Sequence, residues 1–196
     1  MADPQLTSKE TPARSGDALS AGRSLCVSRR QRAAEPSEAV YIGLGANLGD
    51  RQANLSAALD ALGEHADVAV VRVSGVYETR PEGGPPDQNN YLNAVAELRT
   101  RLEPLELLEV LMDVEARLGR RRSAPNAPRT IDLDLLLFGR RRISLPRLVV
   151  PHPRMWRRRF VLTPLADLCD VAAMRAALEQ DGNVDAAAAP GDREEG

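Results

Sequence analysis

The sequence predicts an α+β fold of the ferredoxin-like type, a βαββαβ sandwich in which helices pack on an antiparallel sheet, with additions after it. Three observations predict this fold. Four apolar segments read as strands, two stretches with apolar residues at helical spacing separate them in the required order, and polar loops join them. The length of 196 residues allows one domain with a substantial core. We expect the first and fourth strands to lie side by side at the centre of the sheet.

The first strand is predicted at 39–45 and is followed by a helix of about 12 residues. The strand ends in Gly45, and Asp50 is a plausible N-cap for the helix, which runs to Gly63. The glycines and asparagine of the connecting loop could offer backbone amides to an anion. More commonly, glycines after a strand only make the turn, and both interpretations stay open.

The second and third strands are predicted to form a wide hairpin. Alternating valines indicate a long strand over 67–78, and apolar residues over 91–98 indicate its partner. Residues 80–90 between them are almost entirely polar, and a loop of this length can serve as a lid or binding loop. Pro104 then begins a second helix, whose apolar stripe continues to Gly119.

A second polar loop, 120–128, leads into the stretch on which the functional prediction depends. Residues 131–138 combine apolar β-formers with two carboxylates, Asp132 and Asp134, which project from one face because side chains alternate along a strand. Unpaired carboxylates are costly in a core, so a cation should hold them. Either arginines pair with them, or magnesium binds them together with substrate phosphates. Arg129 adds a guanidinium fork suited to a phosphate.

Residues 147–165 mix a histidine, several arginines and two aromatic side chains. His152 lies between two prolines, and the sequence is equally compatible with a structural and a catalytic role for it. Trp156 and Phe160 are four residues apart, which predicts that they share one helix. Core packing is one of the roles open to them.

Charge is distributed unevenly along the chain. The formal net charge is −2, yet residues 117–159 contain 13 arginines and only two acidic residues. Such a segment attracts a polyanion, either a nucleic acid or a nucleotide, unless the arginines only form a solvated face. The two cysteines are far apart and no apolar run approaches the ~18 residues of a membrane span, which together predict a protein of the reducing cytoplasm.

Both ends of the chain differ from the middle in composition. Residues 1–38 are rich in Ala, Ser, Arg, Glu and Pro without apolar periodicity, which predicts a disordered N-terminal extension rather than a secretion signal. Residues 170–196 are rich in Ala, Gly and acidic residues and predict a largely disordered acidic tail that begins as a helix. The folded domain is therefore predicted at 39–169.

Five motifs occur in order between residues 39 and 168: Y-I-G-L-G-A-N-L-G-D at 41–50, Y-E-T-R-P at 77–81, Y-L-N-A-V at 91–95, P-R-T-I-D-L-D-L-L-L-F-G at 128–139 and V-P-H-P-R-M-W-R-R-R-F-V-L-x-P-L at 150–165. They resemble the 6-hydroxymethyl-7,8-dihydropterin pyrophosphokinase family of folate biosynthesis. The resemblance implies transfer of the pyrophosphoryl group of ATP to the hydroxymethyl oxygen of the dihydropterin, with release of AMP.

The resemblance also implies roles for individual residues. It implies that Asp132 and Asp134 bind two magnesium ions that bridge the ATP phosphates, and that Arg120 and Arg129 are catalytic residues that grip the phosphates. The residues implied to bind ATP are Arg122, Arg129, Arg147, His152 and Arg158. Those implied to contact the pterin are Asn47, Thr79, Tyr91, Asn93 and Phe160. Glu115 resembles an acidic residue of the family at the same place.

One loop departs from the family pattern. Residues 125–127, Pro-Asn-Ala, stand where many members have a basic residue and then a tryptophan, and the loop is one residue shorter. A catalytically impaired relative is therefore one alternative, and a ferredoxin-like module that binds RNA or another anion is a second. RNA modules of this shape stack bases on several aromatic residues, and aromatic residues make up only 3% of this chain. We expect a monomer with small-molecule substrates and with no nucleic-acid or membrane partner.

Overall fold

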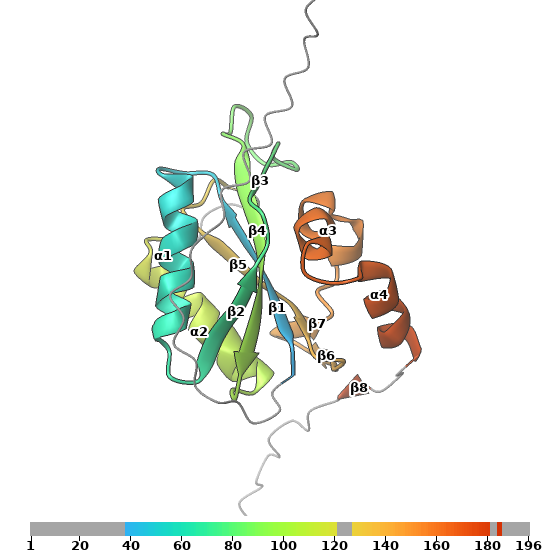
Figure 1. Cartoon of the computed structure of the whole chain (residues 1–196). Helices are drawn as coiled ribbons and strands as arrows, with labels where there is room; N and C mark the ends of the chain where they lie inside the picture. The colour runs from blue at the N-terminus through green and yellow to red at the C-terminus, as the bar shows by residue number, and fades with distance from the viewer. Residues whose placement is uncertain (1–37, 121–126, 181–183, 186–196) are drawn as a thin grey trace, which may run out of the picture.

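The structure, a computed structural model, describes residues 38–120, 127–180 and 184–185. The ferredoxin-like order of strands and helices is confirmed (Figure 1). The strands are β1 (Val40–Ala46), β2 (Val68–Val73), β3 (Tyr77–Thr79), β4 (Tyr91–Thr100), β5 (Asp132–Phe138), β6 (Arg142–Leu145), β7 (Leu148–Val150) and β8 (Val184–Asp185). The helices are α1 (Arg51–Glu64), α2 (Pro104–Arg117), the short 3-10 helix η1 (Met155–Arg157), α3 (Arg159–Ala166) and α4 (Val171–Gln180).

The main sheet has the order β2-β4-β1-β5, with β3 paired to β4 and all neighbouring strands antiparallel. As predicted, the first and fourth predicted strands, β1 and β5, are neighbours, and Gly43 and Gly45 lie opposite Asp134 and Asp132. The prediction that both are central was wrong, because β5 is the outer strand of this order. Since α2 connects β4 to a strand parallel to it and β1 occupies the place between them, β5 must lie at the edge.

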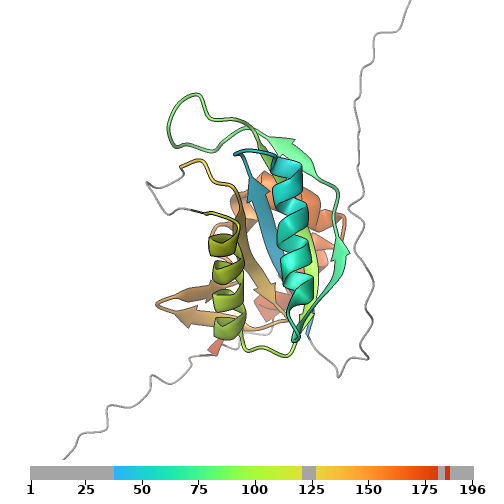
Figure 2. The same ribbon diagram turned by 90° about the vertical axis from the view of Figure 1, so that its left-hand side faces the viewer.

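The predicted long second strand is divided into β2 and β3. At the break, the backbone of Ser74 donates to the carbonyl of Val95 and the Ser74 hydroxyl accepts from the Val95 amide, both at 2.9 Å. The next amide, that of Gly75, donates to the carboxylate of Asp167 at 2.9 Å instead of to a strand. β3 then pairs with the first residues of β4, and the loop 80–90 extends beyond this end of the sheet (Figure 2).

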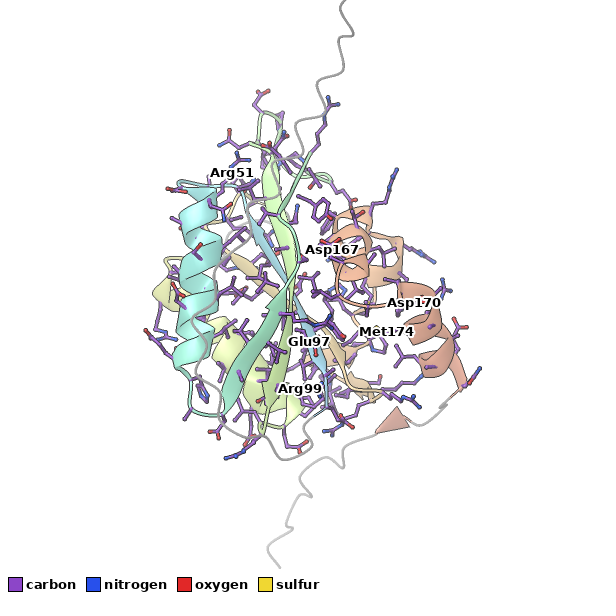
Figure 3. The ribbon with its side chains drawn as sticks, in the orientation of Figure 1. Arg51, Glu97, Arg99, Asp167, Asp170 and Met174 are labelled. Atoms are coloured by element: carbon purple, nitrogen blue, oxygen red, sulfur yellow. The ribbon has the colours of Figure 1, made fainter. Side chains whose placement is uncertain are left out.

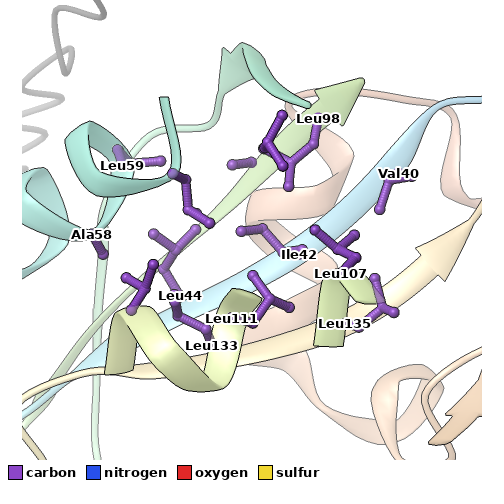
Figure 4. Close-up of a cluster of buried hydrophobic side chains, with 14 of the residues drawn as sticks. Val40, Ile42, Leu44, Ala58, Leu59, Leu98, Leu107, Leu111, Leu133 and Leu135 are labelled. Carbon is purple, nitrogen blue, oxygen red and sulfur yellow. The ribbon is translucent and has the colours of Figure 1, made fainter. Parts of the chain in front are cut away.

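Helices α1 and α2 cover one face of the sheet, and their ends follow the sequence signals. The predicted N-cap Asp50 accepts from the amide of Ala53 at 3.0 Å, and α2 begins with Pro104 and a capping box between Glu103 and Glu106. Because the apolar side chains of both helices and of the sheet meet between the layers, they form one continuous core (Figure 4). The residues labelled there are Val40, Ile42, Leu44, Ala58, Leu59, Leu98, Leu107, Leu111, Leu133 and Leu135.

Helices α3 and α4 lie on the opposite face of the sheet (Figure 1). They form a second core with strand residues that include Tyr41, Val95 and Leu136, and Leu178 of α4 is buried in it. The helix predicted at the start of the tail is therefore present. The remainder of the predicted tail, except β8, lies outside the described residues, as does residue range 1–37, so the predicted domain boundaries stay predictions. None of the helices in the described ranges combines the length and apolar character needed to cross a bilayer.

Candidate active site

A cavity of about 290 Å³ lies against the sheet face that carries α3, where β1, β4 and β5 meet the loop after β3. Strand alternation explains its lining, because every second residue of these strands faces it. The structure brings most of the predicted site residues together here. Those that line the cavity are Thr79, Tyr91, Asn93, Arg120, Arg129, Asp132, Asp134, Arg158 and Phe160.

The floor of the cavity is open because β1 contributes glycines to it. Gly43 and Gly45 both line the cavity, and a Cβ atom added to Gly45 would stand 3.2 Å from Oδ1 of Asn93 and 3.9 Å from Cβ of Asp132. Gly45 was predicted to end the first strand and to belong to a glycine loop that could offer amides to an anion. The signal that was missed is the spacing of Gly43 and Gly45 on one strand face, where they alternate with the core residues Ile42 and Leu44, which indicates close approach of another group.

The two carboxylates of β5 face the cavity, as alternation predicted, but their surroundings differ. Asp132 is paired at both oxygens: Oδ1 lies 2.7 Å from Nη1 of Arg120, and Oδ2 lies 2.7 Å from Nη1 of Arg129. Its side chain is 23% exposed, against 38% for Asp134. The arginine pairing that the sequence left open is therefore present at Asp132.

Asp134 has longer contacts with its cations. Its Oδ2 lies 3.7 Å from Nη1 of Arg158 and 4.0 Å from Nε2 of His152. Burial, and after it the charge of Asp132, raises the pKa of Asp134. Burial lowers the pKa of His152 against the opposing effect of Asp134, and Nδ1 of the ring accepts from the amide of Arg154 at 3.2 Å. The neutral ring therefore carries its proton on Nε2, the nitrogen that faces Asp134.

A third carboxylate, Glu115 of α2, lies behind the pair. Its Oε1 accepts from the backbone amide of Leu133 at 2.7 Å and forms an ion pair with Arg120. Burial raises the pKa of Glu115, while the Leu133 amide and the Arg120 guanidinium act in the opposite direction. Carboxylates and guanidinium groups thus alternate from the buried Glu115 through Arg120 and Asp132 to Arg129, and the last three line the cavity.

The same cavity also has aromatic and uncharged polar side chains in its lining. Tyr91 and Phe160 line it, and Nδ2 of Asn93 donates to the hydroxyl of Thr79 at 2.8 Å. The guanidinium of Arg158 lies 5.3 Å from the centre of the Phe160 ring. A flat heterocycle with polar edges fits such surroundings, because rings stack on the aromatic faces and the amide and hydroxyl can bond to its edge.

The prediction that Trp156 and Phe160 share one helix was wrong. Trp156 belongs to η1 and Phe160 to α3, and the extended backbone of Arg158, with φ −104° and ψ 106°, separates the two helices. Trp156 packs instead beneath Arg175 of α4, with 5.8 Å between the guanidinium carbon and the ring centre. Only Phe160 lines the cavity.

Residues 41–170 match the family model of 7,8-dihydro-6-hydroxymethylpterin-pyrophosphokinase, HPPK, which is well over half of the chain. The chain belongs to the HPPK family. Two relatives named 2-amino-4-hydroxy-6-hydroxymethyldihydropteridine pyrophosphokinase are each 48% identical to it. The one from Bacillus subtilis aligns over 72% of this chain and 86% of its own length, and the one from Pseudomonas aeruginosa over 66% and 79%.

A solved HPPK-DHPS structure in complex with substrates has the same fold. Its TM-score is 0.53 at 14% sequence identity, and the match covers 74% of this chain and 44% of that one. At this identity the likeness concerns the fold alone. It agrees with the ferredoxin-like arrangement described above.

Three predicted site residues of this HPPK chain do not line the cavity, and a fourth lies outside the described residues. Asn47 is fully buried: its Oδ1 accepts from the amide of Arg129 at 2.8 Å, and its Nδ2 donates to Oε1 of Gln88 at 3.2 Å. It thus joins the loop 80–90 to the segment that enters β5. Arg147 pairs with Glu109 of α2 at 2.6 Å. His152 is the third residue that does not line the cavity. Arg122 lies in the range 121–126, outside the described residues.

Two cavity arginines were missed by sequence reasoning. Arg80 and Arg154 both line the HPPK cavity. Each lies inside a motif that was recognised, Arg80 in Y-E-T-R-P and Arg154 in V-P-H-P-R, but neither was given a role. Position within a motif and positive charge were the available signals. Without the fold, nothing showed that these two segments face the same space.

Proposed function

We propose that this protein transfers the pyrophosphoryl group of ATP to the hydroxymethyl oxygen of 6-hydroxymethyl-7,8-dihydropterin, giving AMP and the pterin diphosphate in folate biosynthesis. One observation carries the proposal. A single cavity is lined both by a wall of carboxylates and arginines and by aromatic and amide side chains. The first suits a polyphosphate and the second suits a pterin ring.

The charged wall supports a transfer reaction that depends on position. Phosphoryl transfer requires little covalent chemistry from the protein, so alignment of the reactants and stabilisation of developing charge supply most of the rate. Arg120 and Arg129 reach the cavity from two segments and are both oriented by Asp132. A phosphate that enters the cavity can bond to these guanidinium groups in two-pronged geometry, which orients it as well as neutralising it.

The aromatic side chains that line the cavity support binding of the second substrate. Tyr91 and Phe160 come from β4 and α3, so a ring that enters between them contacts both layers of the structure. Asn93 and Thr79 are already bonded to each other, and each has further capacity for the edge of a heterocycle.

Asp132 and Asp134 fit a site for two magnesium ions. Both are hard oxygen donors, and the contacts of Asp134 with His152 and Arg158 are long, which leaves its oxygens available. Within the described residues no group of three or more His, Cys, Asp or Glu side chains is arranged to hold a metal, so the remaining ligands would be water and substrate phosphate. Magnesium bound there would neutralise charge on the transferred phosphates.

We further propose a monomeric cytoplasmic enzyme whose partners are these small molecules and not nucleic acid. The RNA-binding alternative is not favoured, because carboxylates of β5 face the cavity and the sheet offers few aromatic residues for stacking. The impaired-relative alternative concerns residues 125–127, of which the first two lie outside the described ranges. An assay separates it from the active enzyme.

The deciding experiment is a mass-resolved assay with ATP, magnesium and 6-hydroxymethyl-7,8-dihydropterin. The expected products are AMP and a pyrophosphorylated pterin in equal amounts. ADP with a singly phosphorylated pterin, or ATP hydrolysis independent of the pterin, would contradict the proposed reaction. Tight binding of both substrates without turnover would support the impaired relative instead.

A further inference from the structure

Glu115 is the charged residue on the buried stripe of α2. The other buried residues of this helix are Pro104, Leu107, Leu111 and Val114, and Glu115 is only 4% exposed. A buried carboxylate is costly unless it is both paired and hydrogen-bonded, and an uncharged side chain would pack there at lower cost. The stability of the helix alone therefore does not explain why a carboxylate occupies position 115.

A single oxygen of Glu115 connects two parts of the active site. Oε1 accepts from the backbone amide of Leu133 at 2.7 Å and is paired with Nη1 of Arg120. Leu133 is the residue between Asp132 and Asp134 on β5. The same atom thus contacts both the strand that presents the two acids and the arginine that is paired with one of them.

The backbone ties Arg120 to Glu115 a second time. The amide of Arg120 donates to the Glu115 carbonyl at 3.0 Å, and the amide of Gly119 donates to the carbonyl of Ala116 at 3.1 Å. With Gly119 at φ +80°, these two bonds form the Schellman motif that ends the helix. Arg120 is therefore fixed to Glu115 through both its main chain and its side chain.

The attachment of Arg120 to Glu115 would keep the arginine in place if Asp132 exchanged it for another group. Nη1 of Arg120 lies 2.7 Å from Oδ1 of Asp132, so in this structure the arginine is shared between two carboxylates. We propose that Glu115 is a positioning residue for the transfer reaction: it holds Arg120, and the β5 backbone between Asp132 and Asp134, in place when Asp132 binds another group. This inference rests on the proposed function, since Arg120 is placed there as a phosphate ligand.

The first test is Glu115→Gln, which keeps the side-chain volume and an acceptor for the Leu133 amide but removes the charge. We expect kcat to fall roughly 10- to 100-fold, because misplacement of a catalytic group by about 1 Å has effects of this size. The KM values for ATP and for the pterin should change less than about threefold. A kcat within about twofold of the wild type would overturn the inference.

A double-substitution cycle separates positioning from general structural damage. If Glu115 acts through Arg120, Glu115→Gln should lower kcat by less than about twofold in an Arg120→Ala background. If the two substitutions instead lower kcat by independent factors that multiply, Glu115 does not act through Arg120. That result would overturn the inference.

Glu97 provides a matched control within the same chain. It is also 4% exposed and paired with an arginine, Arg72, whose Nε donates to it at 2.8 Å. It lies four residues beyond Asn93 on β4, and Figure 3 shows it well away from Arg51 at the loop end of the sheet. Glu97→Gln should lower the Tm without changing kcat. Equal loss of kcat in both variants would overturn the inference.

A measurement on the wild-type chain keeps the inference testable if Glu115→Gln does not fold. Nitrogen-15 NMR of the arginine side chains, assigned with the Arg120→Ala spectrum, should show hindered rotation of the Arg120 guanidinium with and without a non-hydrolysable ATP analogue. Free rotation in the complex would overturn the inference. Failure of the wild-type chain to release AMP would overturn the proposed function, whereas an active wild type with an unaffected Glu115→Gln variant overturns only this inference.

Discussion

The two faces of the sheet are made by the same strands and differ in almost every physical property. On the face covered by α1 and α2, apolar side chains form a continuous core. On the other face, α3 and α4 cover part of the sheet and leave a cavity lined by glycine, carboxylate and guanidinium groups. In β1, Ile42 and Leu44 face the core while Gly43 and Gly45 face the cavity. Alternate residues of one strand therefore serve stability and chemistry separately.

The sharpest way to test this separation is Asp134→Ala on the cavity face. Removal of this carboxylate should lower kcat by roughly 10³-fold or more, because it removes a ligand of the proposed magnesium site. The free energy of unfolding should change little, since the contacts of Asp134 with Arg158 and His152 are long. AMP release and denaturant unfolding measure the two effects. Near-normal AMP release would exclude the proposed role.

The converse test is Leu111→Ala on the covered face. Leu111 is fully buried between α2 and the sheet, so its truncation should cost about 2–5 kcal/mol of unfolding free energy. The kcat of the remaining folded enzyme should stay within about twofold of the wild type. Urea unfolding and an active-site titration make the comparison. A large loss of kcat per folded molecule would show that the two faces are coupled more closely than their residues suggest.

Gly45→Ala tests the floor of the cavity with the smallest possible addition. The new methyl group would stand 3.2 Å from Oδ1 of Asn93, so Asn93 must move. We expect the KM for the pterin to rise about tenfold, equivalent to roughly 1.4 kcal/mol, with stability nearly unchanged.

Gly63→Ala is the matched control for Gly45→Ala. Nothing lies within 4 Å of a Cβ atom at Gly63, so this change in α1 should leave the KM unaltered. Steady-state kinetics with the pterin varied would check both variants. Equal KM values for the pterin in the two variants would contradict the role given to the glycine floor.

The smallest expected effect concerns Asp167, which joins the end of α3 to the segment that contains β3. The carboxylate of Asp167, at the end of α3, accepts from the Gly75 amide and from the Tyr77 hydroxyl, all at 2.9 Å (Figure 3). It holds α3, which carries Phe160, against β3, which carries Thr79. Asp167→Ala should raise the KM for the pterin about threefold, while kcat changes little, as steady-state kinetics would show. A lowered kcat at unchanged KM would argue against this role.

Local sequence patterns predicted most of the elements and the acid pair, because periodicity and capping depend on near neighbours in the chain. The edge position of β5 was not predictable in the same way, since it follows from where β1 lies relative to β4 and β5. The divided second strand was missed because Ser74 replaces strand bonds with its hydroxyl, a substitution that a run of alternating valines conceals.

Residues of the acidic motif were predicted correctly to share one site, whereas contacts between residues far apart in the sequence were not predicted. Asp132, Asp134 and Arg129 follow from one motif, whereas the pairing of Glu115 with Arg120 and Leu133 requires α2 to lie against β5. Asn47 shows the reverse case. The family resemblance implied that it contacts the pterin, but its side-chain amide bonds to Arg129 and Gln88, and the contact with the pterin stays a prediction.

The pairing of Asp132 with two arginines has a consequence for how the pocket folds before a ligand binds. Two guanidinium groups so close together would repel each other in an empty pocket, and a site built only to receive phosphates would resist its own assembly. By lying between Arg120 and Arg129 at 2.7 Å from each, Asp132 supplies the missing anion from within the chain. The pocket can therefore fold in the absence of nucleotide, with both arginines already in place.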